Sequence, residues 1–241
     1  LQNLLVIYSS DKFEGRQTGK YGDELAADFL RDFYIKNDIQ PADNTDNYFQ
    51  RYKLNLPGEM LTYQYSFPET LRGYDRYATG ENFVDTQNVA SVIVGKTYPN
   101  SYVIFTGHLD HVGVDGDDVY NGADDNGSGT VSILEIAQAF QNAIKDGIRP
   151  KRSIVFLHVS GEEEGLLGSE YYVNNSLYPI ENTFANINLD MIGRTDPTRG
   201  YEEEDYIYSI GSDRITKKLK RITEDTNRNT INLKLDYRFD I

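Results

Sequence analysis

The feature that most constrains the fold is residues 102–128, where an apolar run ends at a cluster of polar residues. Residues 102–105 read Tyr-Val-Ile-Phe, a continuous apolar run typical of a strand buried on both faces of a parallel sheet. A Thr-Gly pair ends this run, so His108 and Asp110 follow at the carboxyl end of the predicted strand. Because sites in open α/β sheets gather beyond the carboxyl ends of the strands, we expect a functional site here.

Segments of two kinds alternate along the chain. Apolar residues recur every three or four positions in residues 21–36 and 129–146, which predicts amphipathic helices. Residues 87–94, 153–159 and 183–189 have the length and composition of strands. Shorter patterns predict strands at 206–210 and 231–235 and helices at 166–174 and 212–227, with short strands and loops at 48–85. Alternating strands and helices predict a mostly parallel sheet with helices on both faces.

Composition excludes several classes of function. The net charge of −14 over 241 residues argues against a nucleic-acid partner, which needs clustered Lys and Arg. No apolar run approaches the ~20 residues of a membrane span. The absence of cysteine excludes disulfides, thiolate metal sites and Cys nucleophiles. The chain begins at Leu1 rather than methionine, which fits a processed protein, and we expect an extracytoplasmic location, secreted or periplasmic.

Three predicted strands deliver imidazole or carboxylate groups at their carboxyl ends. Taken singly, an Asp after a strand is usually a turn or cap residue, and an acidic run is usually a solvated loop. Their arrival at the same edge of one sheet indicates a metal site, because zinc binds imidazole and carboxylate ligands. The residues are His108 and Asp110 after the first strand, Glu162 and Glu163 after the second and Asp190 after the third, with Asp124 and Asp125 just before a helix.

Other sites fit the sequence less well. His158 lies inside an apolar strand, as a hydrogen-bonded core residue does, and His111 is out of phase with His108. No His-Glu-x-x-His motif or Gly-x-Ser-x-Gly elbow occurs. A calcium-binding EF-hand loop is a minor alternative, because residues 112–123 contain three glycines and no helical period to lead into it. Its ligand positions would be Asp124, Asn126, Ser128 and Glu135, with Gly129 at position six.

Four motifs carry a resemblance to a known family. They are Gly-His-Leu-Asp at 107–110, Gly-Ala-Asp-Asp-Asn-Gly-Ser-Gly at 122–129, Glu-Glu-Glu-Gly-Leu-Leu-Gly-Ser at 162–169 and Asn-Leu-Asp-Met at 188–191. In this order and spacing they closely resemble the zinc-dependent aminopeptidases of peptidase family twenty-eight, in clan MH. The resemblance implies a three-layer α/β/α sandwich with a mixed, mostly parallel central sheet. It also implies one peptidase domain over residues 1–241, without the protease-associated insertion of some members.

The resemblance implies a metalloaminopeptidase. Such an enzyme removes the N-terminal residue of peptide substrates with a free N-terminus, at a co-catalytic pair of zinc ions. His108 and Asp190 are the implied ligands of one zinc and Glu163 of the other, with Asp124 bridging both. Glu162 is the implied general base, standing beside the ligand Glu163 without binding metal.

Two further residues are implied to support the ligands. Asp110 would hydrogen-bond the imidazole of His108 and fix its tautomer. Asp125 would follow Asp124 through a cis peptide bond. The family's second zinc also takes a His from a loop well beyond Asp190, and this chain has no counterpart. We therefore expect a chain truncated at its C-terminus that binds one zinc tightly and the second weakly.

Two rival functions stay open. A glutaminyl cyclase has the same fold and a single zinc, although the motif at 162–169 resembles the peptidase form. A non-catalytic binding domain of the same fold would have lost ligand residues, and the four expected here are present. The sequence does not indicate an oligomeric state.

Overall fold

The computed structural model describes residues 1–55, 83–199, 205–211, 213–214 and 216–239. The chain divides into two compact units, Leu1–Gly193 and Arg194–Ile241, and each is described by itself. Most of the strand-and-loop segment expected at 48–85 lies outside the described residues. Among the described helices, none combines the length and the apolar composition needed to cross a membrane.

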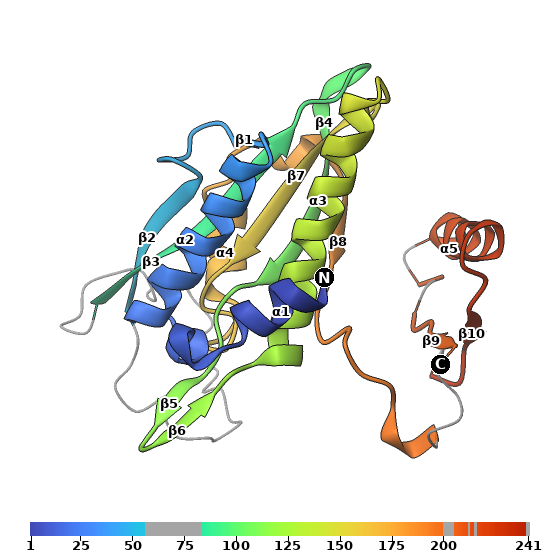
Figure 1. The fold of residues 1–241 in the computed structure, drawn as a ribbon. Helices are drawn as coiled ribbons and strands as arrows, with labels where there is room; N and C mark the ends of the chain where they lie inside the picture. Colours follow the sequence, from blue (N-terminus) through green and yellow to red (C-terminus); the bar gives the residue numbers. More distant parts are fainter. Residues whose placement is uncertain (56–82, 200–204, 212, 215, 240–241) are drawn as a thin grey trace. The chain divides into compact units, whose positions relative to one another are not determined.

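The first unit is built on a six-stranded sheet of order β1-β3-β7-β4-β8, with β2 also paired to β3 (Figure 1). The strands are β1 (Gln40–Pro41), β2 (Phe49–Asn55), β3 (Phe83–Ile93), β4 (Tyr98–His108), β7 (Arg152–Val159) and β8 (Thr183–Asn188), with a separate hairpin of β5 (Gly113–Asp115) and β6 (Asp118–Tyr120). The helices are α1 (Gln2–Tyr8), α2 (Tyr21–Lys36), α3 (Gly129–Lys145) and α4 (Leu167–Asn174), with 3-10 turns at Asp11–Arg16 and Ile180–Asn182.

The sheet is mixed. Strand β4 runs parallel to β7 and to β8, whereas β3 pairs antiparallel with β1, β2 and β7. The predicted α/β fold with a mixed sheet is confirmed. Within the described part of this six-stranded sheet, parallel pairing joins β7, β4 and β8, and the pairs that involve β3 are antiparallel.

Helices cover both faces of the sheet. On one face α1, α2 and α3 bury a cluster that includes Leu30, Leu134 and Phe156, and Figure 1 shows α2 and α3 crossing this face side by side. On the other face, Tyr172 of α4 packs in a second cluster with Leu157. Residues of β7 alternate between the two clusters, so this strand is buried along its length. The sheet therefore lies between two helical layers, as predicted.

The second unit contains a short β-α-β arrangement. Strand β9 (Tyr206–Tyr208) pairs parallel with β10 (Lys234–Asp236), and α5 (Lys217–Asn229) lies between them in sequence, after a 3-10 turn at Pro197–Arg199. The helix predicted over 212–227 begins later, at Lys217. Its N-cap is Thr216, whose hydroxyl accepts a hydrogen bond from the Lys218 amide, and Ser212, the predicted cap, lies outside the described residues.

Asp23 and His158 are among the fully buried titratable side chains of the first unit. The Asp23 carboxylate accepts hydrogen bonds from the hydroxyls of Thr86 and Ser160, and burial raises its pKa to about 7. His158 Nε2 lies 2.6 Å from the Tyr34 hydroxyl, and burial lowers the pKa of this imidazole to about 3. His158 is therefore a core residue, as the sequence predicted.

These two groups should make opposite contributions to the pH dependence of stability. The folded state keeps a proton on Asp23 that the unfolded chain releases near pH 4, so this contribution is lost as pH rises toward about 7. The unfolded chain protonates His158 below about pH 6.5 and the folded state does not, so stability is lost as pH falls toward about 3. Between about pH 4 and 6.5 the two slopes, each at most about 1.4 kcal/mol per pH unit, oppose one another.

We expect Asp23→Asn to remove the contribution of Asp23 to the pH dependence and to keep that of His158. The free energy of unfolding should then rise with pH more steeply than in the wild type. His158→Gln should change the slope in the opposite direction. Urea unfolding at three pH values between 4.5 and 6.5 measures both. Identical slopes in all three proteins would contradict the assignment.

Candidate metal centre

The carboxyl ends of β4, β7 and β8 meet at one edge of the sheet because the three strands are parallel. His108 is the last residue of β4 and pairs with Val159, the last residue of β7. Glu162 and Glu163 follow β7 in a loop, and Asp190 follows β8 by two residues. The predicted convergence of these residues on one edge is therefore present in the structure.

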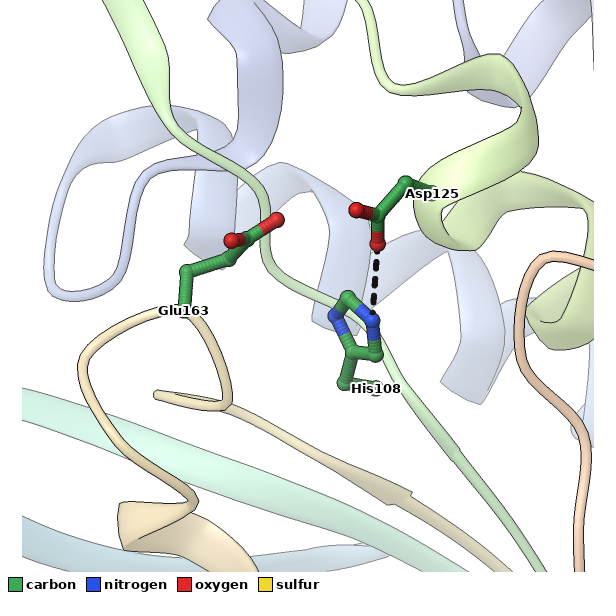
Figure 2. A group of neighbouring side chains, drawn as sticks. All are labelled: His108, Asp125 and Glu163. Carbon is green, nitrogen blue, oxygen red and sulfur yellow. Dashed lines mark ion pairs between the residues drawn. The ribbon is translucent and has the colours of Figure 1, made fainter. Parts of the chain in front are cut away.

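Three side chains form a group that could hold a metal ion. His108, Asp125 and Glu163 each offer one ligand atom, and these atoms lie within 4.8 Å of one another (Figure 2). The His108 imidazole is buried, and its Nε2 lies 3.0 Å from Asp125 Oδ1 and 3.6 Å from Asp190 Oδ1. Two ligands of one tetrahedral zinc, each ~2.0–2.1 Å from the ion, lie ~3.3 Å apart. The spacing around His108 Nε2 therefore suits a shared ion.

The negative charge of the carboxylates around His108 also favours a cation at this position. Burial alone would lower the pKa of this imidazole, but the carboxylates of Asp110, Asp125 and Asp190 outweigh burial and raise it to about 12. Within the described residues, the buried Nε2 has no hydrogen bond of good geometry. A nitrogen facing carboxylates in this way needs a positive charge beside it, either a proton or a metal ion. The donor set of imidazole and carboxylates fits zinc.

Asp125, and not Asp124, is the member of the acidic pair that faces His108. Asp125 belongs to the group that contains His108 and Glu163. Together with Asp190, it is also one of the two carboxylates near His108 Nε2. The cis peptide bond joins Asp125 to Asn126, one residue later than expected. The expectation of a cis bond before Asp125 is therefore wrong, and Asp125 takes the place beside His108 that was expected of Asp124.

Asp124 points elsewhere. Its Oδ1 accepts hydrogen bonds from the Gly193 amide at 2.8 Å and from the Ser128 hydroxyl at 3.1 Å. The Ser128 hydroxyl also accepts from the Ile192 amide. Asp124 therefore joins the turn before α3 to the segment that follows Asp190, through the Gly193 amide.

The start of α3 is packed closely against β8. The Asn126 side chain donates to Leu189 O at 2.9 Å and accepts from the Gly129 amide at 3.0 Å. A Cβ atom on Gly129 would lie 2.2 Å from Leu189 O, so only glycine allows this approach. The Thr130 hydroxyl donates to His108 O. The turn that carries Asp125 is thereby fixed to the ends of two strands.

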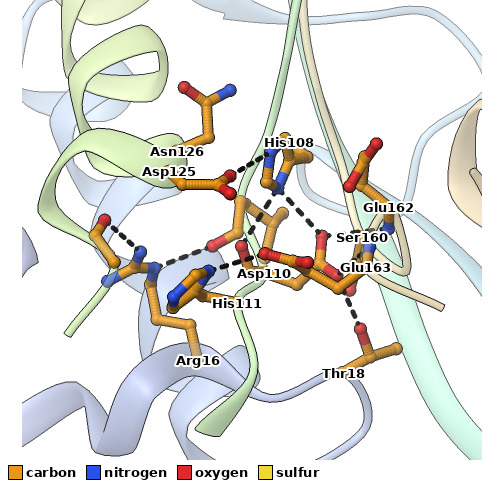
Figure 3. Close-up of polar contacts among 12 residues, drawn as sticks. Arg16, Thr18, His108, Asp110, His111, Asp125, Asn126, Ser160, Glu162 and Glu163 are labelled. Atoms are coloured by element: carbon orange, nitrogen blue, oxygen red, sulfur yellow. Dashed lines mark hydrogen bonds and ion pairs between the residues drawn. The ribbon is translucent and has the colours of Figure 1, made fainter. Parts of the chain in front are cut away.

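Asp110 supports the loop after β7. Its carboxylate accepts from the Thr18 hydroxyl at 2.9 Å and from the amides of Glu162 and Glu163 at 3.2 and 3.3 Å (Figure 3). His108 Nδ1 lies 3.1 Å from the main-chain oxygen of Asp110 and 3.7 Å from its carboxylate. Asp110 thus lies beside His108 as expected, but its carboxylate mainly positions the two glutamates.

The glutamates differ in their surroundings. Burial raises the pKa of Glu162, and among the described residues its carboxylate has no hydrogen-bond partner. The Glu163 carboxylate instead has one oxygen 2.6 Å from His111 Nδ1. Burial also raises the pKa of Glu164. A carboxylate at the site with no fixed partner is suited to accept a proton, and this describes Glu162.

Two residues that sequence reasoning did not select lie at the site. His111, discounted because of its phase, contacts Glu163 (Figure 3). Arg16 is fully buried and donates to main-chain oxygens of Tyr8, Leu109, Asn121 and Gly122 at 2.8–3.2 Å. It joins both ends of the segment between His108 and the Asp125 turn. The sequence signal for Arg16 was only its place in a glycine-containing loop.

Comparisons with known proteins agree with this geometry. The model of Peptidase family M28 matches residues 88–239. Aminopeptidase NAALADL1 of Mus musculus is 37% identical over 108 residues, which cover 44% of this chain and 14% of that protein. The chain therefore spans a small part of this relative.

Two solved structures show the fold. The LapA aminopeptidase of Legionella pneumophila gives a TM-score of 0.62 at 19% identity, with 99% of this chain and 54% of that chain covered. A glutaminyl cyclase from an Acidobacteriales bacterium gives 0.63 at 16% identity, covering 99% and 71%. Both likenesses show the architecture alone, whereas the family model covers more than half of the sequence. The chain belongs to peptidase family M28.

Proposed function

We propose that this chain carries the metal centre of a zinc-dependent aminopeptidase with two co-catalytic zinc ions. His108, Asp125 and Asp190 would hold one ion, and Asp125 and Glu163 would hold the other. The observation that carries the proposal is the buried His108 Nε2 facing Asp125 and Asp190, with Glu163 in the same group. Membership of a peptidase family supports hydrolysis of peptide substrates.

Bound zinc would supply Lewis acidity, which makes water a stronger acid and polarises a carbonyl group. Glu162 would take the proton of the attacking water and pass it to the leaving amine. Asp110 would hold Glu162 and Glu163 in place through their amides. The excess of carboxylates at the site favours a substrate with a cationic group, which the free α-amine of a peptide provides.

Zinc-dependent removal of an N-terminal residue is the test of this function. We expect dialysis of the intact protein against a chelator to abolish cleavage of aminoacyl-anilides, and zinc to restore it. Cyclisation of N-terminal Gln in place of cleavage would favour the cyclase, whose fold is equally similar. Zinc binding without either reaction would favour a binding domain, and full activity without metal would reject the metal centre.

A further inference from the structure

His111 is the one imidazole at this edge of the sheet, among the described residues, that the ligand set does not use. Its Nδ1 lies 2.6 Å from Glu163 Oε1, and the two side chains are only 15% and 22% exposed. An ionised carboxylate only accepts hydrogen bonds, so the Nδ1–H of His111 donates. One oxygen of the Glu163 carboxylate therefore accepts a hydrogen bond from the His111 imidazole.

The position of His111 is set by contacts that do not involve Glu163. Its amide donates to Arg16 O at 3.1 Å, and residues 17 and 111 form an isolated parallel bridge. A Cβ atom on Gly122 would lie 2.6 Å from His111 Cδ2, so the absence of a side chain there lets the ring approach. These contacts place the main chain of His111 and leave room for its ring independently of Glu163.

Arg16 makes this support rigid. Its guanidinium donates to Leu109 O through Nε at 3.0 Å and to Gly122 O through Nη2 at 2.8 Å. These two oxygens lie on either side of His111 in the chain, so the segment that carries His111 is held at both ends. Figure 3 shows the His111 ring beside the Arg16 side chain, with Glu163 across from it.

We propose that His111 is a positioning residue that holds Glu163 with one carboxylate oxygen bound and the other directed to the metal position shared with Asp125. This inference rests on the proposed function. Side-chain partners of this kind fix the orientation of a ligand, and their loss typically weakens metal binding by ~10–100-fold. A glutamate has three rotatable bonds, so without a partner it must be ordered by the ion itself.

Two substitutions of His111, one of them repeated in a Glu163→Gln background, test its role through zinc affinity. In competition titrations against a chromophoric chelator, we expect His111→Leu to weaken one zinc by ~10–100-fold and to leave the other unchanged. His111→Asn should recover most of this loss, because its amide nitrogen can stand where Nδ1 stood and donate to Glu163. In a Glu163→Gln background, His111→Leu should cause little further loss, since the two residues act through one contact.

Thermal unfolding without zinc separates positioning from a general loss of stability, and the two His111 variants should unfold alike. Unchanged zinc affinity in His111→Leu would overturn the inference alone. An equal loss in His111→Asn and His111→Leu would also overturn it, and would point to direct coordination by the imidazole. A wild-type protein that binds no zinc would overturn the proposed function and, with it, this inference.

Discussion

Glu162→Gln should lower kcat by ~10²–10⁴-fold while the protein keeps its zinc. The glutamine side chain has nearly the same shape as glutamate but cannot take a proton from water. Glu162 has no hydrogen-bond partner for its carboxylate among the described residues, so the exchange breaks no contact seen there. The hydrogen bond from the Glu162 main-chain amide to the Asp110 carboxylate is unaffected by the exchange. Steady-state kinetics together with zinc analysis of the same sample measure the effect.

Glu164→Gln is the matched control. Glu164 lies two residues away, and burial also raises its pKa, but no role in proton transfer is assigned to it. Both exchanges remove one charge from the same loop, so Glu164→Gln reports the effect of charge loss alone. We expect its kcat to stay within a few-fold of the wild type. Loss of zinc in Glu162→Gln, with zinc retained in Glu163→Gln, would show that the roles of the two glutamates are reversed.

The convergence of the site could be predicted because it depends on strand direction alone. The carboxyl ends predicted from apolar runs lie within one residue of the observed ends for β7 and β8 and three residues short of it for β4, and parallel strands bring their carboxyl ends to one edge. His108, Glu162, Glu163 and Asp190 follow from that rule. The same rule could not show that β3 pairs antiparallel with β7, because a buried strand has a similar composition in either direction.

The choice between Asp124 and Asp125 could not be made from residue type. Both are aspartates in one turn, and which of them faces His108 depends on main-chain geometry and on the Gly193 amide that binds Asp124. The motif gave the pair but placed the cis bond one residue early. Only the positions of residues far apart in the sequence decide the matter.

His111 was discounted by an argument that holds only inside a strand. Alternation of side chains applies to β4, which ends at His108, so residues beyond it have no strand phase. Arg16 was missed for a different reason. Its acceptors are main-chain oxygens up to 106 residues away, and sequence patterns do not record such contacts.

Asp125→Asn and Asp124→Asn should differ sharply in zinc binding. Asp125 is proposed to contact both ions, so removal of its charge should weaken zinc binding by at least ~100-fold and abolish activity. Asp124→Asn keeps an oxygen that can accept from the Gly193 amide, so we expect its zinc affinity to fall by no more than ~10-fold. Zinc titration of the two purified variants, with the wild type as reference, gives the comparison.

The contrast between the variants matters more than either value. General loss of negative charge is the same in both, so long-range electrostatics cannot produce a large difference between them. A large difference in the expected direction therefore reports the short contact between Asp125 and His108, at 3.0 Å. The reverse order, with zinc lost in Asp124→Asn and kept in Asp125→Asn, would restore Asp124 as the bridging ligand. It would also mean that the turn rearranges around bound zinc, because Asp124 would have to leave Gly193 and Ser128 to reach the ions.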